Sequence, residues 1–132
     1  MKPEIFLYQA GIVVLICAAA AMASVLRKLT GVVGKKQSIW ALPVLSGLML
    51  AAALFAHAYA SFVLVPQFTS EMGVFASLQT AAAADKLSAL KDSIQAIRSQ
   101  VVFLKAFSFT CFFLASLLLA AGTGIYIRWI SK

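Results

Sequence analysis

Apolar residues recur at alternating steps of three and four along the stretch that follows Asp85. This spacing keeps one face of a helix against a neighbouring helix. The same phase continues into an apolar stretch that ends near Ile130, so the pattern predicts one helix that begins in water and ends in lipid. We call the first six positions the seam: Leu87, Leu90, Ile94, Ile97, Val101 and Leu104.

The composition of this face changes along the helix. Large side chains associate in water because they leave solvent, whereas small residues help in lipid because they let helix backbones approach closely. The sequence therefore predicts one contact surface that crosses from water into lipid. Its first heptad position reads Leu87, Ile94, Val101, Ser108, Ala115 and Gly122. A second set of small residues, four apart, is predicted to pack in the membrane: Ser116, Ala120 and Gly124.

Three apolar stretches reach the length of about 20 residues that a membrane-spanning helix needs. They cover residues 4–26, 43–65 and 101–130, and residues 67–100 read as an extramembrane helical segment. The predicted fold is an all-α integral membrane protein, a single membrane domain over residues 1–132. It has three transmembrane helices, and a helical hairpin lies between the second and third spans.

Helix ends are predicted from the prolines, the glycines and one aspartate. Pro3 suits the start of the first helix, and residues 30–34 read as the turn that follows it. Pro43 suits the first turn of the second span, and Pro66 is expected to end that span. Asp85 is the expected N-cap of the final helix.

Composition agrees with a membrane protein. Hydrophobic residues make up 63% of the 132 positions and charged residues 11%, against roughly 25% charged residues in soluble domains. The net charge of +7 lies mostly beside the apolar spans, so it favours anionic lipid headgroups, and no nucleic-acid partner is expected. The sequence contains no H-E-x-x-H motif, no glycine-rich phosphate loop and no G-x-S-x-G motif, and we expect no enzyme activity.

Orientation is predicted from lysine and arginine beside the spans. Four basic residues lie within residues 27–36, which favours a cytoplasmic loop there. The N-terminus would then be outside and the C-terminus cytoplasmic, in what we expect to be a bacterial inner (plasma) membrane.

Three basic residues follow the second seam position of successive heptads: Lys91, Arg98 and Lys105. A parallel homodimer would pair this basic row with Lys86, Ser93 and Gln100, and neither row holds an acid. Two alternatives remain. Either a face of Phe68, Met72, Phe75 and Leu78 covers the seam within one chain, with Glu71 near Lys91 or Arg98, or a partner supplies an acidic helix.

His57 is the only histidine and lies within the second span. An ionisable group there suggests either axial ligation of haem, with a second histidine from another subunit, or a hydrogen bond between helices. No other cofactor and no metal site is predicted.

The expected function is that of a small membrane subunit with a structural or assembly role in a homo- or hetero-oligomeric complex. Its extramembrane helices would dock a partner. The alternatives are an electron-transfer subunit that uses His57 with haem or quinone, and a small pore-forming protein.

Overall fold

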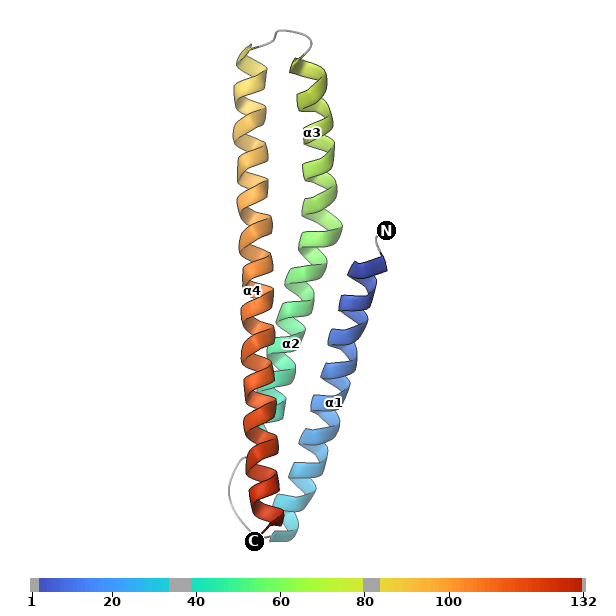
Figure 1. The fold of residues 1–132 in the computed structure, drawn as a ribbon, viewed down its shortest axis with the longest axis vertical. Coiled ribbons are helices and arrows are strands. Elements are labelled where there is room, and N and C mark those ends of the chain that lie inside the picture. Colours follow the sequence, from blue (N-terminus) through green and yellow to red (C-terminus); the bar gives the residue numbers. More distant parts are fainter. Residues whose placement is uncertain (1–2, 34–38, 80–83, 132) are drawn as a thin grey trace. The chain divides into compact units, whose positions relative to one another are not determined.

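The computed structural model describes residues 3–33, 39–79 and 84–131, and every regular element assigned within these ranges is helical (Figure 1). Within these ranges, three continuous helical runs are long and apolar enough to cross a membrane: Pro3–Val32, Ala41–Gln79 and Ala84–Ile130. The prediction of an all-α chain with three membrane-length helices is therefore confirmed. The elements are α1 (Pro3–Val33), α2 (Ala41–Tyr59), the π-helical turn η1 (Ala60–Leu64), α3 (Val65–Gln79) and α4 (Ala84–Ile130).

The chain divides into two compact units. The first unit comprises Met1–Leu54 and Ser108–Lys132, and the second comprises Phe55–Phe107. Both α2 and α4 contribute to each unit, because each of these helices crosses the boundary as an unbroken element.

The core of the first unit takes one residue from each of its three helices. Ile12 of α1, Leu50 of α2 and Ala115 of α4 are each at most 1% exposed and form one cluster. Along α1 the buried positions recur every seven residues, at Ile12, Ala19 and Leu26. This repeat keeps a single stripe of α1 against α2 and α4, since seven residues complete two helical turns.

The helix that begins as α2 does not end at Pro66, contrary to the sequence prediction. Proline lacks an amide hydrogen, and its ring crowds the carbonyl four residues earlier, here that of Phe62. The structure widens the turn immediately before it: the Val65 N–H donates to the carbonyl of Ala60, five residues earlier. The wider π turn accommodates the proline, and the helix continues as α3 to Gln79.

Two other predicted helix ends are corrected. α1 begins at Pro3 as predicted, but it continues beyond Thr30 to Val33; position 34 of the predicted turn lies outside the described residues. The Thr30 hydroxyl donates to the carbonyls of Leu26 and Arg27, so the helix accommodates this side chain. Asp85 lies inside the first turn of α4 and is not its N-cap. Its negative charge in this turn still interacts favourably with the positive end of the helix dipole.

Candidate functional site

The seam coincides with the half-buried face of α4 in the second unit. All six seam residues are half-buried, and among residues 84–107 the only other half-buried position is Ser93. The remaining residues of this part of α4 are exposed. The spacing read from the sequence therefore marks the face that α4 turns toward the rest of the unit.

The face opposite the seam belongs to η1 and α3. Its residues are Leu64, Phe68, Glu71, Phe75 and Leu78, of which Leu64 is buried and the others are half-buried. Met72, which the sequence placed on this face, is 45% exposed. Steps of four, three, four and three separate these residues, so the heptad phase selects Glu71 in place of Met72.

A hydrogen bond joins α3 to α4, which lie side by side in the second unit (Figure 1). The Ser93 hydroxyl donates to the Glu71 carboxylate at 2.7 Å. The sequence predicted Glu71 near Lys91 or Arg98. Its hydrogen-bond partner, Ser93, lies two residues after Lys91. A small apolar pocket lies next along the pair, lined by Val65 and Phe68 of α3 and by Arg98, Val101 and Val102 of α4.

In the first unit the face of α4 that continues the seam phase is buried. Ser108, Ala115 and Gly122 are buried, together with Cys111. A Cβ atom built on Gly122 would lie 3.4 Å from Met22 Cε and 3.9 Å from Leu42 Cβ, so α1 and α2 both approach this glycine. Small residues therefore occur where the three helices come close together.

Two serine hydroxyls link α2 and α4 inside the first unit. Ser46 donates to the carbonyl of Ala115 at 2.9 Å, and Ser108 donates to the carbonyl of Ala53 at 3.0 Å. The Tyr8 hydroxyl of α1 lies 3.5 Å from Ser108 Oγ. Ser46 was not among the predicted site residues, although a serine within an apolar run indicates a hydrogen bond between helices.

The second set of small residues has a different environment. Ser116, Ala120 and Gly124 are exposed, and a Cβ atom on Gly124 would meet nothing within 4 Å. The Ser116 hydroxyl donates to the carbonyl of Phe112 in its own helix. Packing of this set against another subunit stays a prediction.

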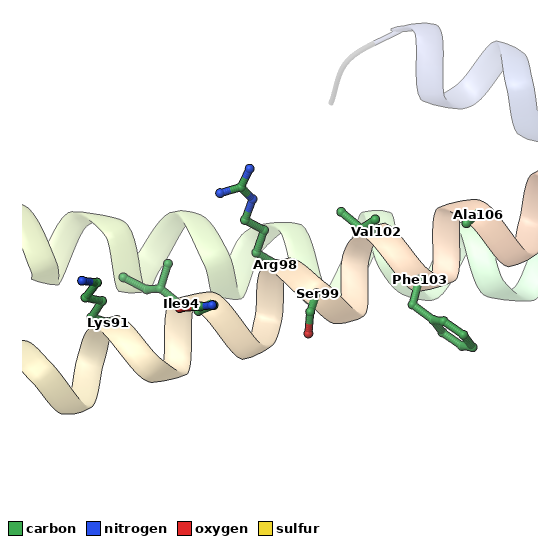
Figure 2. A pocket seen from close by; sticks show the side chains of 8 residues that line it. Lys91, Ile94, Arg98, Ser99, Val102, Phe103 and Ala106 are labelled. Carbon is green, nitrogen blue, oxygen red and sulfur yellow. The ribbon is translucent and has the colours of Figure 1, made fainter.

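The basic row lies on the exposed surface of the second unit. Lys91, Arg98 and Lys105 are all exposed, and the first two line an open groove on α4 (Figure 2). The groove is lined by Lys91, Ile94, Gln95, Arg98, Ser99, Val102, Phe103 and Ala106. Basic and apolar side chains thus share one surface.

His57 is half-buried on α2, one turn before η1. Ala53 and Ser61, four residues to either side, are buried and half-buried, so small side chains flank the imidazole as the sequence suggested. Among the residues that the structure describes, no group of three or more His, Cys, Asp or Glu side chains could hold a metal ion. Haem ligation by His57 stays a prediction.

No family model, no curated protein and no solved structure matches this chain.

Proposed function

We propose that this chain is a small structural subunit of a membrane complex. Its apolar helices pack in the bilayer, and the extramembrane hairpin of α3 and the first part of α4 docks a partner protein. The observation that carries the proposal is the length of α4, 47 residues. At 1.5 Å per residue this is about 70 Å, more than twice the roughly 30 Å of a hydrocarbon core.

The distribution of charge supports this placement of α4. Residues 106–127 contain no Asp, Glu, Lys or Arg and would span roughly 33 Å, close to the thickness of the hydrocarbon core. Six charged residues precede them within α4: Asp85, Lys86, Lys91, Asp92, Arg98 and Lys105. Charged side chains are costly inside lipid, which favours water or headgroups around the earlier part of the helix.

The proposed orientation places α3 and the first part of α4 outside the cytoplasm, with both the 27–36 loop and Arg128 on the cytoplasmic side. The basic residues of that loop support it. Cysteine labelling tests it after the native Cys17 and Cys111 are replaced by alanine. A membrane-impermeant maleimide should label Ser88→Cys in intact cells and Ser131→Cys only after permeabilisation. The reverse pattern would overturn the orientation.

The assembly role is tested by the mass of the particle extracted in mild detergent. We expect a protein mass well above the 14.1 kDa of one chain, with other subunits of the complex identified by mass spectrometry. A particle that contains one chain and no other protein, across several mild detergents, would contradict the proposal. Chemical cross-linking in the intact membrane before extraction provides the control for dissociation by detergent.

A further inference from the structure

We infer that the groove on α4 binds an anionic phospholipid, with the acidic headgroup beside Arg98, on the side toward Lys91, and an acyl chain along Val102, Phe103 and Ala106. The inference rests on the proposed placement of α4 in the membrane. The groove is shallow and open, and all of its lining residues belong to α4.

Apart from Ile94, which lies between Lys91 and Arg98, the polar lining residues precede the apolar ones along the helix. Figure 2 shows Lys91, Arg98 and Ser99 toward one end and Val102, Phe103 and Ala106 toward the other. Arg98 and Val102 are one helical turn apart, so the polar and apolar parts meet within about 6 Å along the axis. A ligand that matches this surface has a polar group and an apolar chain joined end to end.

The charge of the groove selects an acidic headgroup. Lys91 and Arg98 are seven residues apart, which places both cations on one side of α4 about 10 Å apart along the axis. No Asp or Glu lines the groove. The guanidinium group of Arg98 offers several N–H donors in a plane, a geometry that suits the oxygens of a phosphate group.

The exposed apolar side chains favour a lipid over an acidic helix. Val102 and Phe103 are 61% and 69% exposed, and they lie just before the charge-free residues 106–127. An acidic helix in water would pair with the cations but leave this apolar part in solvent. An acyl chain covers the apolar part where α4 enters the bilayer, and the headgroup lies beside Arg98, one turn before Val102. Lys91 adds electrostatic attraction from the water side.

Binding of dioleoylphosphatidylglycerol to the full chain tests the inference. Native mass spectrometry from neutral detergent micelles measures retention of this lipid against dioleoylphosphatidylcholine. We expect preferential retention of phosphatidylglycerol, and a loss of roughly 10- to 30-fold in its affinity in a Lys91→Gln/Arg98→Gln variant. The matched control, Lys86→Gln/Arg128→Gln, removes the same charge from exposed residues that do not line the groove and should bind as the natural chain does.

Each other outcome has a definite meaning. Equal retention of the two lipids, or equal losses in the two double variants, would overturn the inference. So would binding of a glutamate-rich amphipathic peptide in place of the lipid. If Ser88→Cys is labelled as proposed but lipid preference is absent, the lipid inference alone fails. If the particle contains only one chain but the Lys91/Arg98 variant loses phosphatidylglycerol selectively, the lipid site stands and the assembly role fails.

Discussion

The Ser46 hydroxyl of α2 lies 2.9 Å from the carbonyl oxygen of Ala115 in α4, and Ser108 of α4 makes the reciprocal bond to Ala53 of α2 at 3.0 Å. Both serines are at most 1% exposed. Because each bond ends on a backbone carbonyl, its acceptor survives any side-chain substitution. The pair fixes the register of α2 against α4 at two levels of the first unit.

Replacing either serine with alanine should destabilise the first unit. Hydrogen bonds between membrane helices contribute about 0.6 kcal/mol on average and up to about 1.7 kcal/mol. We expect Ser46→Ala and Ser108→Ala each to cost an amount in this range, measured by thermal unfolding in detergent. The exposed Ser116 is the matched control, since its hydroxyl bonds only within α4. A Ser116→Ala loss as large as the other two would contradict the role assigned to the pair.

Substitutions at two glycines of α4 test packing within the chain and packing against another subunit separately. A side chain on Gly122 would press on Met22 and Leu42, whereas one on Gly124 meets open space. Gly122→Leu should therefore cost about 1–3 kcal/mol of stability through overpacking. Gly122→Ala should be close to neutral, because the nearest atom is the flexible end of Met22.

Gly124→Leu should leave the stability of the single chain unchanged but reduce the mass of the detergent-extracted particle. The reason is that Ser116, Ala120 and Gly124 are exposed within one chain, and bulky residues keep membrane helices apart. Analytical ultracentrifugation measures the mass, and thermal unfolding provides the stability control. An unchanged particle mass would show that this set of residues is not part of the assembly surface.

The seam was predictable because the burial of a single amphipathic face depends on the spacing within one helix. The Ser46–Ala115 bond was not predictable in the same way, because it requires the register between two helices distant in sequence. The general rule that proline ends a helix predicted a break at Pro66. The π turn before Pro66 accommodates the proline, so the helix continues. The prediction placed the apolar Met72 on the face that covers the seam, but the heptad phase makes Glu71 the half-buried residue there.

Breaking the seam should disrupt the second unit. Ile94 and Ile97 are half-buried on α4, and aspartates there would place two charges against the apolar face of α3. We expect Ile94→Asp/Ile97→Asp to lower the stability by several kcal/mol, since the lost apolar burial and the cost of burying a charge add together. Protection of the α3 and α4 amides in hydrogen exchange measures the loss.

The matched control for the seam is Ala89→Asp/Ala96→Asp, which adds the same charges at exposed positions of the same part of α4. This variant should keep the amide protection of the natural chain. If both double variants lose protection equally, the effect comes from charge on α4 and the seam has no special role.

The hydrogen bond between Ser93 and Glu71 predicts that substitutions at these two residues have non-additive effects on the free energy of unfolding. Glu71 is half-buried among the apolar residues of its face, and the Ser93 hydroxyl donates to its carboxylate at 2.7 Å. Ser93→Ala should cost about 1 kcal/mol, because it leaves the carboxylate partly buried without this donor. Glu71→Leu/Ser93→Ala should recover that loss, since an apolar side chain continues the face formed by Phe68, Phe75 and Leu78.

A double-mutant cycle on unfolding free energies measures the coupling. Additive effects of the two substitutions would show that the bond contributes nothing to the pairing of α3 with α4.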